Sequence, residues 1–293
     1  MGPRGLNTFF KKTRPTGIMQ TNLFKFRGKT IVIDVSIYLY RYNTNNELFE
    51  NFYAMLNIFK INKITPLFVF DGPPPPEKYE TINQRKTERN EAEKEYNELL
   101  LQNKPVPKKQ LERLQRKKTK VSYNNKLQLK KLFDYYGTTY VEAENEADEL
   151  CVEYVKSGKA WACLSDDMDM FLYGCPRILR YFSILNESVI YYDLDEIISY
   201  YGIKQNDFVK ICVLSGTDYN SKFYNIEELF NMYARCNNFQ IDTLIKDNEM
   251  IIKIVNGYCE RKYFILLDKI ENKIQDKKNL VEFLETYNFV FIN

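Results

Sequence analysis

Three short apolar segments, each followed directly by acidic or hydroxyl residues, constrain the fold of this chain more than any other feature. They are Thr30–Ile33 before Asp34, Leu67–Phe70 before Asp71, and Trp161–Leu164 before Ser165, Asp166 and Asp167. Continuous apolar runs of this length are typical of strands buried on both faces of a parallel sheet. Because the carboxyl ends of parallel strands meet at one edge, these acids are expected to lie together there.

The segments between and after these strands predict helices. Glu47–Ile61 has apolar residues at helical spacing and would form the crossover of a right-handed βαβ unit. Charged residues predict a projecting arm with helices at Glu88–Leu101 and Gln110–Lys131 and a turn at Lys104–Pro107. Asn145 is expected to cap a further helix, and the chain after residue 194 is expected to be mainly helical.

The predicted fold class is therefore α/β, with a parallel-rich central sheet flanked by helices. Two units are expected: a core over residues 1–220, which includes the arm at about 78–136, and a helical C-terminal lobe over residues 221–293.

Composition limits the chemistry. The chain has no histidine, which excludes Ser-His-Asp triads, histidine bases and most catalytic zinc sites. Net charge is only +3, but residues 78–131 hold 16 Lys and Arg against 7 Asp and Glu, which suits contact with phosphate.

The six cysteines form no CxxC pair, so buried reduced thiols are expected. No apolar run reaches about 18 residues and no signal peptide opens the chain, which predicts an intracellular protein without a membrane span.

Without histidine, hydrolysis of a phosphodiester needs another source of hydroxide and of charge neutralisation. Two divalent metal ions about 3.5–4 Å apart supply both. Mg²⁺ prefers carboxylate and water oxygens, so two ions need several acids from separate segments. The candidates are Asp34, Asp71, Glu146, Asp148, Asp167, Asp169 and Asp218.

Each candidate also has a purely structural interpretation. Asp34 could simply end a strand, and Asp71-Gly72-Pro73 is an ordinary turn signal. Asn145 with Asp148 resembles a capping box, where Glu146 and Asp148 would suit the helix dipole. Asp167 and Asp169, with Asp166, fit a solvated loop, and Asp218 fits a turn. Acids from three strand ends and one helix start at a single edge favour the metal site.

Six ordered motifs cover about the first 220 residues. They are Met1-Gly2-Pro3-Arg4-Gly5-Leu6, Ile33-Asp34-Val35-Ser36 with Tyr40, Val69-Phe70-Asp71-Gly72 with Pro74 and Pro75, Asn145-Glu146-Ala147-Asp148, Ser165-Asp166-Asp167-Met168-Asp169, and Leu214-Ser215-Gly216-Thr217-Asp218-Tyr219. Together they resemble the flap endonucleases, the XPG/Rad-type family of structure-specific 5′ nucleases. Asp166 is the acid that the family motif leaves out.

The resemblance implies two Mg²⁺ ions, with Mn²⁺ as a substitute. Asp34, Asp71, Glu146 and Asp148 would surround one ion, and Asp167, Asp169 and Asp218 the other. Asp148 stands where the family usually has glutamate, so its side chain is one methylene shorter.

The resemblance also implies DNA contacts. Lys78 and Arg85 are seven residues apart, which places both on one helix face at the base of the arm. In the family, a Lys and an Arg at these positions hold the scissile phosphate. Tyr40 would stack on the neighbouring base, Gly2 would also contact DNA, and the arm would form an arch over the active site. The alternatives are a solvated basic face for Lys78 and Arg85 and a core position for Tyr40.

The stretch Asn220–Ile226 lacks the glycines of the family's phosphate-holding hairpin, so duplex DNA is expected to be held by Lys and Arg side chains. No sliding-clamp motif is recognisable, and a monomer is expected. The expected activity is 5′ flap endonuclease and 5′-3′ exonuclease on branched or flapped DNA in replication, repair or recombination. The expected location is the nucleus or, for a viral member, a cytoplasmic replication site. A PIN-type ribonuclease and a catalytically silent DNA-structure-binding protein are the alternatives.

Overall fold

The computed structural model describes residues 2–74, 76–101, 106–220, 224–236, 239–260 and 264–289. Its helices are α1 (Leu6–Thr13), α2 (Val35–Asn43), α3 (Leu48–Ile61), α4 (Tyr79–Leu101), α5 (Lys108–Lys118), α6 (Tyr123–Tyr136), α7 (Ala147–Lys156), α8 (Asp169–Leu172), α9 (Leu194–Tyr201), α10 (Gln205–Leu214), α11 (Ile226–Cys236), α12 (Phe239–Ile245), α13 (Glu249–Cys259) and α14 (Lys277–Glu285). Its strands are β1 (Ile18–Asn22), β2 (Thr30–Asp34), β3 (Thr65–Phe70), β4 (Thr139–Glu142), β5 (Ala162–Leu164), β6 (Arg177–Ser183) and β7 (Ser188–Asp193).

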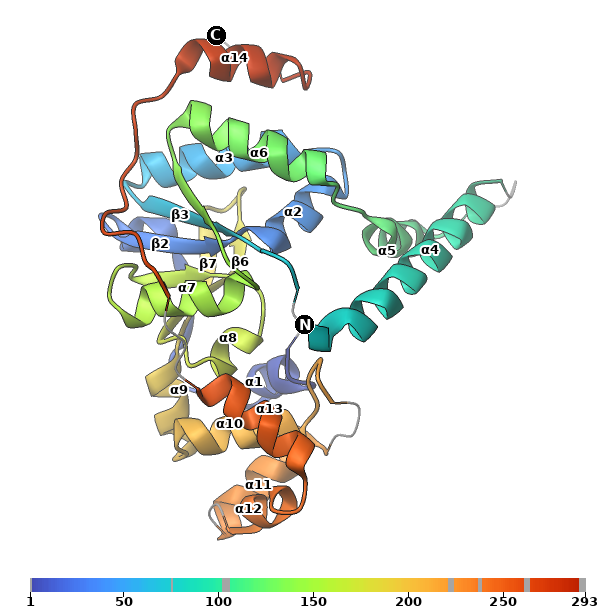
Figure 1. Cartoon of the computed structure of the whole chain (residues 1–293), viewed down its shortest axis with the longest axis vertical. Coiled ribbons are helices and arrows are strands. Elements are labelled where there is room, and N and C mark those ends of the chain that lie inside the picture. The colour runs from blue at the N-terminus through green and yellow to red at the C-terminus, as the bar shows by residue number, and fades with distance from the viewer. Residues whose placement is uncertain are drawn as a thin grey trace.

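A seven-stranded sheet in the order β1-β7-β6-β5-β2-β3-β4 forms the centre of the molecule (Figure 1). The strand β2 pairs in parallel with both β3 and β5, and β4 and β6 extend the parallel part on either side. The strands β7 and β1 complete the sheet in antiparallel pairs. The parallel-rich sheet, its three predicted strands and the crossover helix α3 are therefore confirmed.

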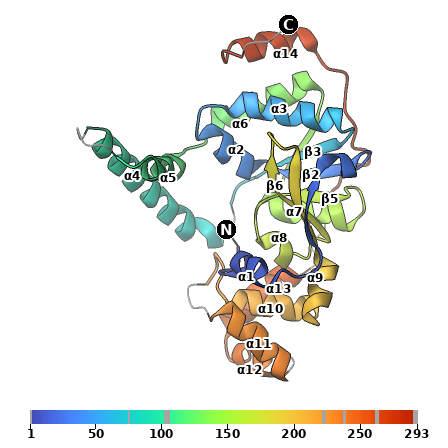
Figure 2. The same ribbon diagram turned by 180° about the vertical axis from the view of Figure 1, so that it is seen from behind.

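Helices cover both faces of the sheet, and the alternation of side chains along β2 shows how. Ile31 and Ile33 point into a core shared with α2, α3 and α6, whereas Val32 points into a second core shared with α7, α8 and α10. Burial of such a side chain contributes roughly 1.5–3 kcal/mol, so a charge at any of these positions would be costly. The two groups of helices lie on opposite sides of the sheet in both views (Figures 1 and 2).

The helices α4 and α5 pack against each other and project from one side of the molecule, as the predicted arm requires (Figure 2). The expected single helix Gln110–Lys131 was wrong, because the chain breaks after α5 and restarts as α6. The physical reason is a capping box in which Ser122 and Asn125 satisfy each other's backbone N–H groups. The predicted turn at Lys104–Pro107 falls partly on residues 102–105, which lie outside the described part of the chain.

The helix α6 belongs to the body of the molecule. Its residues Leu129, Leu132 and Phe133 are fully buried against the sheet. The arm, as the term is used below, therefore consists of α4 and α5.

The C-terminal region has two surroundings. The helices α11, α12 and α13 pack around α10, next to the core. Residues 264–276, here called the strap, then run back along the sheet, and α14 packs against α6 at the opposite end of the molecule (Figure 1). Backbone hydrogen bonds tie the strap to the body: Lys273 donates to the Gly137 oxygen at 2.6 Å, and Asp276 donates to the Tyr135 oxygen at 2.8 Å. A unit boundary at residue 220 stays a prediction.

Two expectations from composition can be compared with the fold. Cys151, Cys163, Cys175 and Cys212 are buried free thiols as expected, but Cys259 is exposed and corrects the expectation for that residue. None of the described helices is long and apolar enough to cross a membrane.

The strap makes Gly137 a position where a side chain should be costly. Gly137 ends α6 with a φ of +78°, and an added Cβ would lie 2.5 Å from the Lys273 backbone oxygen. Left-handed strain alone costs about 1–2 kcal/mol, so Gly137→Ala should lower the free energy of unfolding by more than this. Urea denaturation would measure the loss.

Gly158→Ala is the matched control for this variant. Gly158 also has a left-handed φ, +77°, but nothing lies within 4 Å of its added Cβ. Equal losses in the two variants would contradict the close packing of the strap on α6.

Candidate active site

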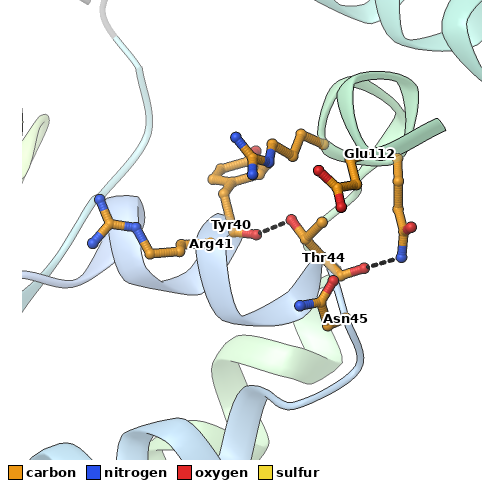
Figure 3. Close-up of a pocket in the computed structure, with 7 residues that line it drawn as sticks. Tyr40, Arg41, Thr44, Asn45 and Glu112 are labelled. Atoms are coloured by element: carbon orange, nitrogen blue, oxygen red, sulfur yellow. Dashed lines mark hydrogen bonds between the residues drawn. The ribbon is translucent and has the colours of Figure 1, made fainter. Parts of the chain in front are cut away.

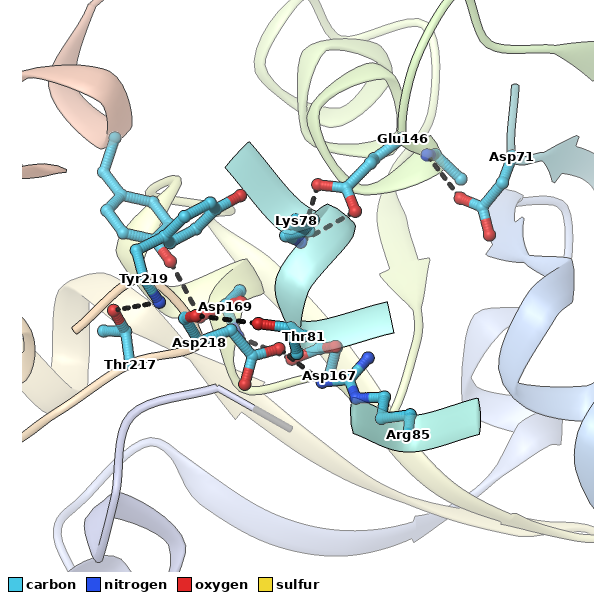
Figure 4. Close-up of polar contacts among 12 residues, drawn as sticks. Asp71, Lys78, Thr81, Arg85, Glu146, Asp167, Asp169, Thr217, Asp218 and Tyr219 are labelled. Atoms are coloured by element: carbon cyan, nitrogen blue, oxygen red, sulfur yellow. Dashed lines mark hydrogen bonds and ion pairs between the residues drawn. The ribbon is translucent and has the colours of Figure 1, made fainter. Parts of the chain in front are cut away.

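All seven predicted acids lie at the carboxyl edge of the parallel strands or at adjoining helix ends. Asp34 ends β2, Asp71 follows β3, Asp167 and Asp169 follow β5, Glu146 and Asp148 begin α7, and Asp218 follows α10. Several of their side chains face the same space (Figure 4). The fold thus brings together residues that are up to 184 positions apart in the sequence. Their assignment to metal ions stays a prediction.

Hydroxyl groups and backbone amides link Asp34 and Asp71. The Ser36 hydroxyl donates to the Asp71 carboxylate, and the Ser36 amide donates to Asp34 Oδ1 at 3.0 Å. Ser165 donates its hydroxyl to Asp34 Oδ2, also at 3.0 Å. These bonds fix the direction in which each carboxylate points.

Asp71 also takes the place of a helix cap. The Ala147 amide at the start of α7 donates to Asp71 Oδ1 at 2.8 Å, whereas the N-cap residue is Glu146 and makes no capping bond. The capping role expected for Asn145 was therefore wrong. A carboxylate from a neighbouring strand satisfies the helix end instead, which leaves Glu146 and Asp148 available for other partners.

The carboxylates are crowded enough to disturb one another. Burial, followed by repulsion from Asp71 and Asp167, raises the pKa of Asp34 well above its usual range. Burial and repulsion from Asp167 and Asp34 do the same to the pKa of Asp148. Burial and Asp167 raise the pKa of Asp169 to about 8. Carboxylates gathered in this way require positive charge nearby if they are all to be ionised.

Two basic residues at the base of the arm, Lys78 directly before α4 and Arg85 within it, supply part of that charge. Lys78 Nζ lies 2.7 Å from both carboxylate oxygens of Glu146, and an Arg85 guanidinium nitrogen lies 2.6 Å from Asp218 Oδ2 (Figure 4). Burial, the largest single influence, would lower the pKa of Lys78, but the charge and hydrogen bonds of Glu146, together with Tyr219 and Asp148, leave that pKa raised. Both bases therefore reach the acid edge, which contradicts a merely solvated basic face.

The residues present fit divalent magnesium in their chemistry. Every donor is a carboxylate oxygen, the ligand type that Mg²⁺ prefers, and the pKa values of Asp34, Asp148 and Asp169 are raised by burial and by repulsion from neighbouring carboxylates, which a bound cation would offset. Within the described residues, no group of three acidic or cysteine side chains is placed to hold an ion as it stands. Two of the predicted ligands, Glu146 and Asp218, are instead paired with Lys78 and Arg85.

Gly2 lies against the loop that holds Asp167 and Asp169, and Tyr40 belongs to α2, which starts directly after Asp34. The Gly2 backbone is so close to the acid loop that an added Cβ would lie 2.6 Å from Met168 Cβ. Tyr40 is 49% exposed, whereas its neighbours Tyr38 and Tyr42 are buried. The core interpretation of Tyr40 is therefore wrong. Contact of either residue with DNA stays a prediction.

The sequence did not indicate Tyr258 as part of the site. This buried residue of α13 donates its hydroxyl to Asp169 Oδ1 at 3.2 Å and packs against Tyr173 with ring centroids 4.8 Å apart. The C-terminal helices thus orient a predicted metal ligand directly. A tyrosine in an amphipathic helix far from any motif carries no signal of such a role.

Asp166 has a structural role that the motif did not reveal. It accepts a hydrogen bond from the Tyr181 amide at 2.6 Å and forms an ion pair with Arg41 of α2. Tyr181 has a left-handed φ of 57°, a conformation that this hydrogen bond helps to hold. Asp166 therefore ties the acid loop to both α2 and β6.

Asp166→Ala should consequently lower the free energy of unfolding by about 1–3 kcal/mol, because it leaves a backbone donor without its partner. Asp166→Asn keeps an oxygen acceptor for the Tyr181 amide and loses the charge and the hydrogen-bond acceptor that face Arg41, so its loss should be smaller than that of Asp166→Ala. Chemical denaturation of both variants would check this, and equal losses would show that the Tyr181 bond contributes little.

The segments that carry these acids match two domains of a known protein family. The XPG N-terminal domain matches residues 1–92, and the XPG I-region matches residues 137–218. The arm helix α5 lies between the two matched regions.

Individual relatives agree with the family matches. Human flap endonuclease 1 is 27% identical over 238 residues, which is 75% of this chain and 62% of the human protein. The chain thus spans somewhat less than two thirds of the length of this relative.

Solved structures match over more of the chain. The catalytic core of Rad2 in complex with DNA substrate has a TM-score of 0.71 at 19% identity, over 96% of this chain and 94% of that one. Flap endonuclease-1 from Methanococcus jannaschii has a TM-score of 0.67 at 25% identity, over 92% and 90%. The first confirms the 5′ nuclease fold, and the family matches assign the sequence: this chain belongs to the XPG family, whose members include the flap endonucleases.

Proposed function

We propose that this chain is a magnesium-dependent, structure-specific 5′ nuclease that hydrolyses phosphodiester bonds in branched or flapped DNA. The observation that carries the proposal is the pairing of Lys78 and Arg85 with acids at the carboxyl edge of the sheet. Carboxylates suited to metal ions and cations suited to a phosphate meet there at one place. Membership of a family of metal-dependent nucleases supports the same function.

Two metal ions are assigned to the acids. Asp34, Asp71, Glu146 and Asp148 would hold one Mg²⁺, and Asp167, Asp169 and Asp218 the other. When bound, the ions would supply a metal-activated water at neutral pH and stabilise charge on the attacking and leaving oxygens. No histidine is present to act as a general base, so the chemistry rests on these acids and the two bases.

The chain's own side chains would position the substrate. Lys78 and Arg85 would exchange their carboxylate partners for the scissile phosphate and stabilise the charge that develops on it. The hydrogen bonds of Ser36, Ser165 and Tyr258 keep three of the predicted ligands oriented before substrate arrives. The basic arm stands beside this edge, where it would guide the 5′ single strand.

Duplex binding would rely on side chains. The stretch 220–226 lacks the glycines of a phosphate-holding hairpin, although residues 221–223 lie outside the described part of the chain. We expect Lys and Arg to grip the duplex, with affinity that falls steeply with salt.

Cleavage of labelled substrates would test the function. Purified chain should cut a 5′ flap in Mg²⁺ and in Mn²⁺, and should bind but not cut in Ca²⁺. Nicked, gapped and four-way-junction DNA, compared with the flap at equal concentration, would define the preferred structure. Preferential cutting of a matched RNA flap would instead identify a ribonuclease, and binding without cutting in any metal would identify a silent binding protein.

A further inference from the structure

A pocket of about 240 Å³, here called the strap pocket, lies between the end of α3, the start of β3 and the strap. It is separate from the cavity of about 600 Å³ between α2 and α5, which includes Tyr40 and belongs with the expected contact of that residue with DNA (Figure 3). The volume of the strap pocket falls below the roughly 300–1,000 Å³ of sites that enclose a whole small molecule. It suits a single side chain.

The strap pocket has an apolar floor and an apolar lip. Leu56 and Ile64 are almost fully buried, and Pro66 of β3 completes the floor. Ile274 of the strap also lines the pocket, yet it is 96% exposed. An apolar side chain that entered the pocket would be buried against the floor, and the residues next to it would cover Ile274.

Hydrogen bonds fix the wall that the strap contributes. The backbone N–H groups of Lys273 and Asp276, on either side of Ile274, donate to backbone oxygens at the end of α6. Lys60 of α3 donates to Gln275 Oε1 at 3.1 Å and so joins the two walls. Ile274 is therefore exposed on an anchored backbone. The pocket is formed before a partner arrives, which lowers the entropic cost of binding.

The rim of the strap pocket is positively charged. Lys60, Lys273 and Lys277 line it, all three are exposed, and no acid belongs to the lining. Within the described ranges, none of these lysines forms an ion pair with a carboxylate, and Glu271 is instead paired with Lys269 at 2.8 Å. The rim would therefore attract carboxylates from outside the chain.

The strap pocket lies away from the acid edge. Ile64 and Pro66 stand at the start of β3, whereas Asp71 follows its end. The six residues of β3, at about 3.3 Å each, separate the two edges by about 20 Å. The strap and the arm also lie on opposite sides of the molecule in both views (Figures 1 and 2). A partner in the pocket would leave the acid edge open to substrate.

We propose that the strap pocket docks an extended segment of a partner protein in which one aliphatic side chain is flanked by aspartate or glutamate. The aliphatic side chain fits the apolar floor, and the flanking acids fit the three lysines of the rim. A nucleic-acid backbone would match the lysines but not the floor, and a neutral or basic segment would leave the lysines unmatched. The docking goes beyond the proposed nuclease function and does not depend on it.

Peptide display on the full chain would test the docking. Peptides selected from a random library should share an aliphatic residue flanked by acids, and one of them, carrying a fluorophore, would then be titrated by fluorescence anisotropy. Lys273→Glu and Lys277→Glu should each weaken its binding at least about tenfold, because a like charge across the interface opposes association. Ile274→Asp should weaken binding by a similar factor, because it removes apolar contact and adds repulsion.

The matched controls are Lys278→Glu and Ile265→Asp. They make the same changes at exposed positions of α14 and of the strap that do not line the pocket. Both should bind the peptide as tightly as the unaltered chain. Saturating flap DNA in Ca²⁺ should leave the affinity for the peptide unchanged, because the acid edge and the pocket are separate.

Four results would overturn the proposal. The selection could yield no binders or peptides without the acidic and aliphatic pattern, or the selected peptide could bind the pocket variants and the unaltered chain equally. Displacement of the peptide by flap DNA would assign the lysines to nucleic acid instead. A dimer in sedimentation velocity that Ile274→Asp abolishes would assign the pocket to a second copy of this chain.

Discussion

Asp169→Asn should reduce cleavage of a 5′ flap by about three orders of magnitude while the flap still binds, because one of the acids assigned to a metal ion is lost. A metal ion contributes several kcal/mol to a transition state of this kind, and each 1.36 kcal/mol is about tenfold in rate. Asp169 is 2% exposed and accepts the Tyr258 hydroxyl, and asparagine retains an oxygen for that bond. Single-turnover cleavage in Mg²⁺ and anisotropy in Ca²⁺ would separate rate from binding.

A control for charge alone is Asp195→Asn, which alters an exposed acid in the first turn of α9. It should cut at the rate of the unaltered chain. If Asp169→Asn also retained most of its activity, Asp169 would not be a metal ligand and the grouping of the acids would need revision.

Lys78→Ala and Arg85→Ala should each lower the single-turnover rate at saturating Mg²⁺ by about 10²–10³, the usual cost of losing one donor to a developing anion. Substrate affinity should change far less, because both bases are expected to act mainly in the transition state. Lys86→Ala is the matched control, since Lys86 is an exposed residue of α4, next to Arg85, with no ion-pair partner among the described residues. Single-turnover rates and anisotropy would be measured on the same flap.

The ion pairs of these bases add a second readout. Lys78 holds Glu146, so Lys78→Ala releases a predicted ligand, and the Mg²⁺ concentration for half-maximal cleavage should stay equal or fall. The same should hold for Arg85 and Asp218. A large rise in the Mg²⁺ requirement would mean that the bases organise the metal site rather than the phosphate. Equal losses in affinity and rate would make them ordinary phosphate contacts.

The strands that the sequence predicted are those buried on both faces. The residues Ile31, Ile33 and Leu67 are almost entirely buried, and such continuous apolar runs can be recognised without any knowledge of their neighbours. The strands β1 and β4 have few or no buried residues, and β6 includes a buried Arg180. Neither a continuous apolar run nor a regular alternation of apolar and polar residues therefore identified these strands. Their place in the sheet comes from pairing with distant strands, which local pattern does not encode.

The same distinction applies to the site. The position of the acids was predictable because the carboxyl ends of parallel strands share one edge of the sheet, and an acid that directly follows such a strand lies at that edge. The partners of those acids were not predictable, because they depend on how the arm and α13 pack on the core. Lys78 meets Glu146 across 68 residues of sequence, and Tyr258 meets Asp169 across 89. The capping of α7 by Asp71 likewise joins residues 76 positions apart.

The strap has a consequence for self-association. The strand β4 is the last in the sheet, and an uncovered edge strand offers its free N–H and C=O groups to a strand of another chain. The Thr139 hydroxyl, at the first residue of β4, donates to the Glu271 backbone oxygen of the strap at 2.8 Å. A chain truncated before the strap would leave this edge open. Oligomers and aggregates built by pairing of β4 edges are therefore the first expected result of such a truncation, ahead of any defect in catalysis.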